Sequence, residues 1–205
     1  MARQIHFGML SQSKLNKFLL EYASTYSLQC SIRPEWSSKN PDHRLAIRLA
    51  IQDCVGDFPR LLDLGWVPDK IHNRFVSISH CPEAGGFILA NVPVGFDLEE
   101  PAKVTLPVVS RLSSSQEVLH APHPAALWSA KEAAYKSLVS TQTQPPVMSQ
   151  IEIFGWIQNS EEFWKFQYRP CTTPNPGGSS GVVYLAPNIV CAIAFFHSTL
   201  VRIDR

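Results

Sequence analysis

Apolar residues recur along the chain at two spacings, which predict helices in some segments and strands in others. The predicted helices cover residues 13–27, 41–55, 127–140 and part of 108–119. The predicted strands cover residues 74–79, 87–90, 94–99, 150–157, 162–169 and 188–196. Helices and strands that follow one another in this mixed order favour an α+β fold.

The predicted helix over residues 41–55 has two different sides. We expect Leu45 and Leu49 to face a core, because they lie one turn apart. Arg44 and Arg48 also lie one turn apart and are expected on another side of the same helix.

The two strands near the middle of the chain, residues 87–90 and 94–99, are separated only by the turn Asn91-Val92-Pro93. This spacing predicts a β-hairpin. Turn-forming and polar residues predict a loop over residues 65–73, and a segment rich in Pro, Gly and Ser predicts a flexible loop over 171–181.

Each half of the chain runs from helices to strands, which indicates two similar α+β halves in one chain, a pseudo-dimer. We expect residues 1–100 to form the N-terminal half and residues 101–205 the C-terminal half, with 101–107 as the connection. No residue-level repeat accompanies this similarity. A chain of 205 residues is long enough for one large domain or two small ones.

Composition excludes several classes of protein. The hydrophobic fraction of 45% is that of a globular protein and not of a disordered one. Eighteen Lys and Arg residues balance seventeen Asp and Glu residues, so the net charge is +1 and no nucleic-acid partner is expected. No apolar run reaches the ~20 residues of a membrane span, and residues 1–10 carry no secretory signal.

The five cysteines are scattered and form no CxxC pair, which argues against disulfides or structural zinc and for a reducing cytoplasm. The histidines form no HxH or HExxH pattern, and the chain has no phosphate-binding loop, GxGxxG or GxSxG motif. We therefore expect a cytoplasmic protein, with no membrane partner, whose chemistry depends on neither zinc nor a dinucleotide.

Alternation is strict in the strand over residues 94–99. It places Gly95, Asp97 and Glu99 on one face, with the two carboxylates roughly 6–7 Å apart, near enough to share one cation. Gly95 would let a ligand approach the backbone closely. The alternative is an ordinary strand face that is exposed to solvent.

One lysine of the helix over residues 127–139 lies where an apolar residue would be expected. Lys131 falls near the middle of the apolar arc, while Glu132 and Lys136 lie together on its flank at a spacing of four residues. A single such lysine can extend to solvent. A cluster of this kind instead favours a site for an anionic ligand, with a metal ion bridging the glutamate to phosphate.

Three segments, taken in order, resemble the signature motifs of the 4′-phosphopantetheinyl transferases. They are Ser77-Ile78-Ser79-His80, Val94-Gly95-Phe96-Asp97-Leu98-Glu99 and Trp128-Ser129-Ala130-Lys131-Glu132-Ala133-Ala134-Tyr135-Lys136. The chain length and the position of the acidic strand are similar to those of the surfactin-synthetase-activating type. That resemblance implies two similar halves with the active site between them.

The resemblance implies transfer of 4′-phosphopantetheine from coenzyme A to a serine of an acyl or peptidyl carrier protein, with release of adenosine 3′,5′-bisphosphate. The carrier would serve fatty-acid, polyketide or nonribosomal peptide synthesis. The implied metal ligands, for Mg²⁺ or alternatively Mn²⁺, are Asp97, Glu99 and Glu132. The implied catalytic residues are Glu132 as general base, with Lys131 and Lys136 stabilising phosphate charge. The implied coenzyme A ligands are His80, Ser79 and Arg44 at the 3′-phosphate, together with Lys131 and Lys136.

The chain departs from the family pattern before its Ser-His pair. Members of this type carry a Gly-Lys-Pro tripeptide there, whereas this chain has Gly65-Trp66-Val67. Lys70 or Arg74 is a candidate to replace the missing lysine. The departure leaves open a catalytically weakened relative that only binds coenzyme A or a carrier protein, and the carboxylates alone would also suit an unrelated Mg²⁺-dependent phosphohydrolase.

The resemblance also implies a monomer that docks an acidic carrier protein. Basic and apolar residues early in the second half of the chain are the candidates for this surface, because carrier proteins are acidic and present a small apolar patch. These residues are Val108, Val109, Arg111 and Leu112. The alternative is that they pack against and cap a helix.

Overall fold

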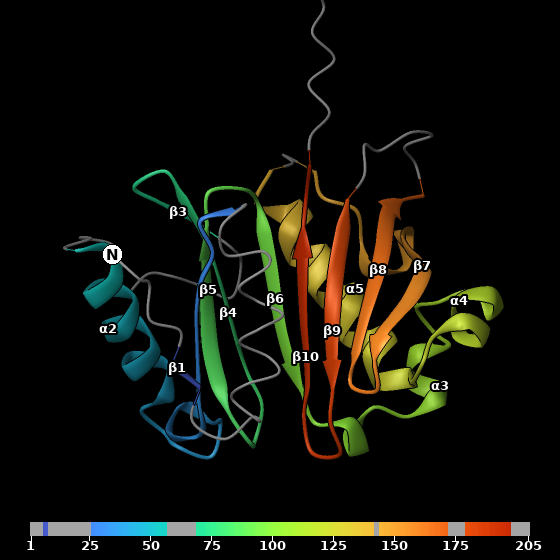
Figure 1. The fold of residues 1–205 in the computed structure, drawn as a ribbon, viewed down its shortest axis with the longest axis horizontal. Coiled ribbons are helices and arrows are strands. Elements are labelled where there is room, and N and C mark those ends of the chain that lie inside the picture. Colours follow the sequence, from blue (N-terminus) through green and yellow to red (C-terminus); the bar gives the residue numbers. More distant parts are fainter. Residues whose placement is uncertain (1–5, 8–25, 57–68, 142–143, 172–178, 198–205) are drawn as a thin grey trace, which may run out of the picture.

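The computed structural model describes residues 6–7, 26–56, 69–141, 144–171 and 179–197 (Figure 1). These residues form two five-stranded sheets and few helices, which confirms the prediction of an α+β fold. The strand order is β1-β2-β5-β4-β3 in the first sheet and β6-β10-β9-β8-β7 in the second. Neighbouring strands are antiparallel except for β1 and β2, which are parallel.

The first sheet contains β1 (His6–Phe7), β2 (Gln29–Arg33), β3 (Asp69–Ile71), β4 (Arg74–His80) and β5 (Gly85–Ala90). The second contains β6 (Val94–Glu99), β7 (Ile151–Ser160), β8 (Phe163–Pro170), β9 (Ser180–Leu185) and β10 (Val190–Phe195). The α-helices are α2 (His43–Val55), α3 (Leu106–Val109), α4 (Ser115–His120) and α5 (Pro124–Val139). Three 3₁₀ turns complete the described elements: η1 (Pro34–Trp36), η3 (Pro101–Lys103) and η4 (Met148–Gln150).

Two residues explain why the long helix α5 begins at Pro124. Pro124 occupies the first helical turn, where its missing amide hydrogen is no loss, and the His123 side chain accepts a hydrogen bond from the Ala125 amide. Small residues on the helix then allow close packing against the second sheet. Gly95 of β6 shows how close: a Cβ atom there would lie 1.8 Å from the carbonyl oxygen of Ala133.

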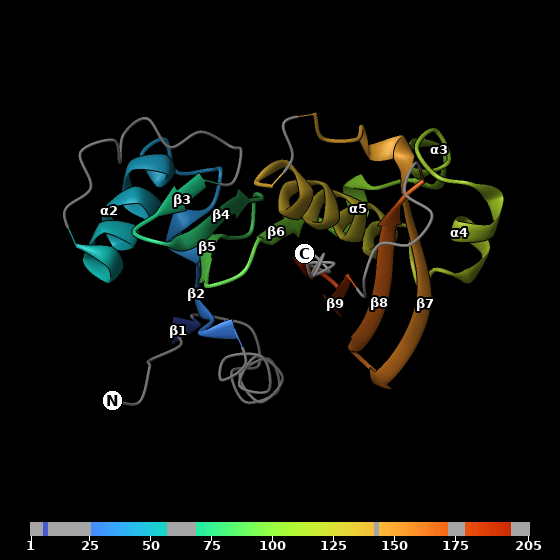
Figure 2. The same ribbon diagram turned by 90° about the horizontal axis from the view of Figure 1, so that it is seen from above.

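Three apolar clusters hold the layers together. One lies between the two sheets and includes Ile88, Phe96 and Ile193. The second lies between α5 and the second sheet, and the third between α2 and the first sheet. Viewed from above, α2 and α5 lie on the same side of the molecule, each over its own sheet (Figure 2).

Most predicted elements are confirmed, including α2, α5, β4 and β6. Four strands were not expected: β1, β2, β3, and β9, which begins at the end of the predicted loop over 171–181. The predicted loop over 65–73 contains the short strand β3 within its described part. The predicted helix over 13–27 lies almost wholly outside the described residues.

The predicted hairpin between residues 87–90 and 94–99 is wrong. β5 pairs with β2 and β4, whereas β6 pairs with β10. The turn at Asn91-Val92-Pro93 therefore carries the chain from one sheet to the other. β6, which falls within the predicted N-terminal half, is hydrogen-bonded into the second sheet.

The expected core face of α2 is also wrong. Leu45 and Leu49 are 46% and 49% exposed, and Ile47 and Ile51 are buried instead. The helix offers two apolar stripes about 200° apart, and periodicity alone does not show which of them meets the sheet.

No helix in the described part of the chain is both long and apolar enough to cross a membrane.

Candidate functional site

The face of the first sheet meets the edge of the second where β4 lies beside β6. Among the described strands β6 is at the edge of its sheet, so alternate amides on its outer side have no strand there to bond. Two serines of β4 take that place: Ser77 Oγ accepts a hydrogen bond from the Phe96 amide at 2.9 Å, and Ser79 Oγ accepts one from the Leu98 amide at 3.0 Å. Ser79, an expected coenzyme A ligand, thus joins the two sheets.

Asp97 lies at the centre of this junction and is 6% exposed. Its Oδ1 accepts hydrogen bonds from the Ser79 hydroxyl at 3.2 Å and from Lys136 Nζ at 2.9 Å. Its Oδ2 is buried and has no hydrogen-bond partner among the described residues. The alternative of a solvent-exposed strand face is therefore wrong, because this face of β6 turns toward α5. Gly95 makes room there for the backbone of α5, and the expectation that it makes room for a ligand does not hold.

Glu99 of β6 and Glu132 of α5 are half-buried and lie near Asp97. Burial raises the pKa of Glu99, and the Asp97 carboxylate raises it further, although the Glu100 amide opposes both effects. Burial also raises the pKa of Glu132, as do the charges of Asp97 and Glu99, while Lys136 lowers it. Three carboxylates from two elements thus repel one another in a partly dry environment, which a bound cation would relieve.

Cationic and imidazole groups border the carboxylates. His80 is at the end of β4, and burial lowers its pKa to about 4, aided by His43, Arg44 and Lys136. These groups come from β4, from the first turn of α2 and from α5. Because His80 is neutral near pH 7, it can donate a hydrogen bond to an anion, while Arg44 and Lys136 supply positive charge.

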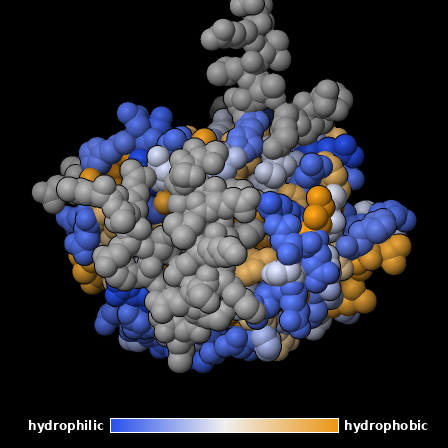
Figure 3. Space-filling model, in the orientation of Figure 1, coloured by the Kyte–Doolittle hydropathy of each residue, from blue (hydrophilic) through white to orange (hydrophobic). Residues whose placement is uncertain are grey.

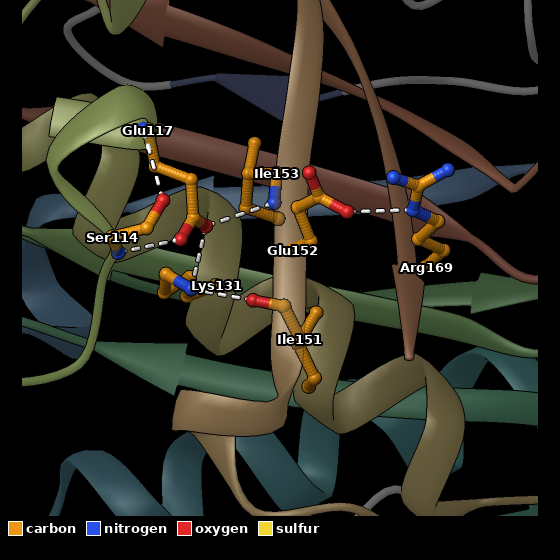
Figure 4. A network of polar contacts seen from close by, with 7 residues as sticks. All are labelled: Ser114, Glu117, Lys131, Ile151, Glu152, Ile153 and Arg169. Carbon is orange, nitrogen blue, oxygen red and sulfur yellow. Dashed lines mark hydrogen bonds and ion pairs between the residues drawn. The ribbon is translucent and has the colours of Figure 1, made fainter. Parts of the chain in front are cut away.

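Lys131 does not join this group. It is 1% exposed, and its Nζ forms an ion pair with Glu117 of α4 at 2.7 Å and a hydrogen bond with the carbonyl oxygen of Ile151 (Figure 4). Glu117 also accepts hydrogen bonds from the amides of Ser114 and Ile153. The network ties α4, α5 and β7 together, so the prediction that Lys131 lies in the apolar arc is confirmed, but its charge is already paired.

Lys70 and Arg74 are the candidates to replace the lysine that the resemblance leads us to expect. Residues 65–67 are outside the described part. Arg74 donates hydrogen bonds to Gln29, Ser27 and Leu89, and so joins β4 to β2 and β5. Lys70 is exposed on β3, with its Nζ 5.6 Å from the ring centre of Phe75.

The expected docking residues differ in exposure. Val109 is 1% exposed and packs in the core under α5. Val108 and Leu112 are half-buried, and Arg111 is exposed. Apolar side chains gather at the edge of the molecule near α3 and α4, where Leu106 and Leu119 are 51% and 73% exposed (Figure 3).

Within the described residues, no three His, Cys, Asp or Glu side chains converge closely enough to form a ready metal site. The donor chemistry nevertheless fits a hard divalent cation. Asp97 has a buried carboxylate oxygen without a partner among the described residues. The pKa values of Glu99 and Glu132 are raised by burial and, to a smaller extent, by neighbouring carboxylates. Mg²⁺ is held in this way by few carboxylates, with substrate phosphate completing its shell.

Three residues that shape the site were not singled out from the sequence. Ser77 shares the alternation of Ser79, which could have indicated its role. Glu117 stands three residues after Ser114, the spacing of a capping box, and the structure contains that capping box. No sequence pattern distinguishes His43 from the other histidines.

A comparison of this sequence with protein-family models gives no match, and a comparison with curated proteins gives none either.

Proposed function

We propose that this protein transfers 4′-phosphopantetheine from coenzyme A to a serine hydroxyl of an acyl or peptidyl carrier protein. One observation carries the proposal: acidic and basic side chains lie close together at one place in the fold. The carboxylates of Asp97, Glu99 and Glu132 lie beside Lys136 and His80, where β4, β6 and α5 meet. Paired anionic and cationic groups of this kind suit a pyrophosphate that bridges a metal ion and lysine.

In the proposed reaction, the carrier serine oxygen bonds to the phosphorus that bears the pantetheine arm. The bond from that phosphorus to the bridging oxygen of the pyrophosphate breaks, and adenosine 3′,5′-bisphosphate leaves. Glu132 takes the serine proton, a role that its raised pKa suits. Lys136 stabilises the charge that builds up on the leaving phosphate.

Asp97, Glu99 and Glu132 would hold Mg²⁺, or Mn²⁺ in its place, and the ion would neutralise charge on the phosphates of bound coenzyme A. Ser79 and Lys136 fix the Asp97 carboxylate by hydrogen bonds to Oδ1 and so leave Oδ2 for the metal. His80 and Arg44 would hold the 3′-phosphate. Lys131, whose charge is paired with Glu117, would support the helix that carries Glu132.

We further propose that the carrier protein docks along α3. Its exposed Leu106 and the following Arg111 offer an apolar and a basic contact to an acidic, partly apolar partner. Val108 and Leu112 would line the same surface, whereas Val109 supports it from the core.

The decisive experiment incubates the protein with coenzyme A, Mg²⁺ and several apo carrier proteins, and reads the carrier's intact mass. A gain of one phosphopantetheine arm that is lost in Asp97→Asn and Glu132→Gln supports the transferase. Glu152→Gln is the matched control, because Glu152 forms an exposed ion pair with Arg169 in the Figure 4 view.

Other outcomes separate the alternatives. No gain on any carrier, with coenzyme A still bound, would favour a relative that only binds. Release of inorganic phosphate or hydrolysis of coenzyme A without a carrier product would favour a phosphohydrolase.

A further inference from the structure

We infer that His43 is a positioning residue that orients His80 toward the 3′-phosphate of the nucleotide, an inference that rests on the proposed function. The two imidazole rings come from different elements. His43 is the first residue of α2, and His80 is the last residue of β4. Their ring centres lie 4.3 Å apart, with an interplanar angle of 78°.

The orientation of the His43 ring is itself fixed. Its Nδ1 lies 2.5 Å from the carbonyl oxygen of Asn40, and because a carbonyl can only accept, Nδ1 carries the proton. The side chain is 8% exposed, and its Nε2 is buried with no hydrogen-bond partner in the described residues. The ring therefore acts on His80 by contact and not by a hydrogen bond from that nitrogen.

An edge-to-face contact of this kind restricts the rotation of the neighbouring ring. His80 is half-buried, so part of the residue remains accessible. The positive charges of Arg44 and Lys136 act on His80, and Arg44 is assigned with it to the 3′-phosphate. His43 thus holds the His80 ring within the influence of the Arg44 charge, an arrangement that suits a phosphate monoester.

The position of Arg44 strengthens this assignment. It follows His43 directly on α2, so the segment that supports His80 also supplies a guanidinium group. If His43 is removed, the loss should fall on the phosphate that His80 and Arg44 recognise. It should not fall on the pyrophosphate near Lys136 and the carboxylates.

The test measures binding of adenosine 3′,5′-bisphosphate and of adenosine 5′-monophosphate by calorimetry. The second nucleotide lacks the 3′-phosphate. In His43→Ala we expect affinity for the bisphosphate to fall by about tenfold, with affinity for the monophosphate unchanged. His43→Phe keeps a flat ring against His80 and should retain most of the preference, while His80→Ala should abolish it.

His120→Ala is the matched control, because His120 is an exposed histidine at the end of α4. An equal loss for both nucleotides in His43→Ala, or no loss in a folded His43→Ala, would overturn the inference. If His43→Ala does not fold, a loss of the preference in His43→Phe equal to that in His80→Ala would overturn it. If the unaltered protein itself binds both nucleotides equally, the proposed 3′-phosphate site is wrong, and the inference about His43 falls with it.

Discussion

Lys136 Nζ lies 2.9 Å from Asp97 Oδ1 and 2.9 Å from the carbonyl oxygen of Phe96. One ammonium group therefore joins the last turn of α5 to the middle of β6. The two side chains are 14% and 8% exposed, so solvent screens this pair less than it screens an ion pair on the surface. The same charge lowers the pKa of Glu132, against the effects of burial and Asp97, which raise it.

Removing the Lys136 charge should shift the pH dependence of transfer. Lys136→Met takes away the group that lowers the pKa of Glu132, so the pKa should rise further. Because the deprotonated carboxylate is the base, activity falls as pH falls through that pKa. The acidic limb of kcat/KM should therefore move to higher pH, and the maximum should fall by about tenfold or more.

Lys136→Arg is the control for that experiment, since it keeps the positive charge. Its acidic limb should stay close to that of the unaltered protein. An acidic limb that does not move in Lys136→Met would show that Glu132 is not the titrating base.

The two serines of β4 form a matched pair for separating stability from activity. Ser77 and Ser79 each satisfy a buried amide of β6, but only Ser79 also donates a hydrogen bond to Asp97. Replacing either serine by alanine leaves a buried amide unsatisfied, which should lower the free energy of unfolding by about 1–3 kcal/mol. Only Ser79→Ala should also reduce transfer, as measured under conditions where both variants are folded. Equal activity in the two would remove Ser79 from the site.

The sequence predicts the elements that carry the site better than it predicts how they meet. The alternation of β6 and the apolar arc of α5 are strong local patterns, and both elements are confirmed. β6 pairs with β10, and the partners Phe96 and Ile193 are 97 residues apart in the sequence, so no local pattern indicates this pairing. A hairpin between β5 and β6 was therefore expected wrongly, because closeness in sequence is only one of the terms that decide strand pairing.

The sequence likewise predicts where a charged side chain lies better than it predicts the partner of that charge. The helical wheel places Lys131 correctly in the buried arc, but the wheel does not include its partner Glu117, which comes from another helix. Likewise, alternation alone does not show whether the face of β6 that carries Asp97 is exposed to solvent or buried. The close contact of Gly95 with α5 decides for burial.

The buried pair of Lys131 and Glu117 should matter for stability. Lys131→Met leaves Glu117 buried without its charge partner and should lower the free energy of unfolding by about 3–5 kcal/mol. Adding Glu117→Gln should recover part of that loss, because the unpaired charge is gone. Chemical denaturation of the single and double variants measures the coupling. Arg169→Met is the surface control, expected at under about 1 kcal/mol.

Acid should remove the contribution of that pair. Although burial raises the pKa of Glu117, the ammonium of Lys131 and two backbone amides outweigh it, so the pKa lies below its usual value of 4.5. A lowered carboxyl pKa stabilises the fold above the unfolded-state pKa and ceases to do so as pH falls through the folded-state value. The stability difference between the unaltered protein and Lys131→Met should therefore shrink as pH falls below 4.5 and through the lowered pKa of Glu117. A difference that stays constant down to pH 2 would contradict this account.

The close contact of β6 with α5 gives a last prediction that needs no assumption about chemistry. In Gly95→Ala the new Cβ atom would lie 1.8 Å from the Ala133 carbonyl oxygen and 2.7 Å from the Ser137 amide nitrogen, both backbone atoms of α5. Relief requires the helix to move away from β6, which would also pull Lys136 from Asp97. We expect a loss of more than about 3 kcal/mol in thermal or chemical unfolding. Gly56→Ala is the control: its Cβ would meet nothing within 4 Å. Only the backbone conformation opposes it, since φ of 80° with ψ of −170° is a region essentially restricted to glycine and costs about 1–3 kcal/mol. If Gly95→Ala proves no more destabilising than Gly56→Ala, then α5 does not pack on β6 as closely as described.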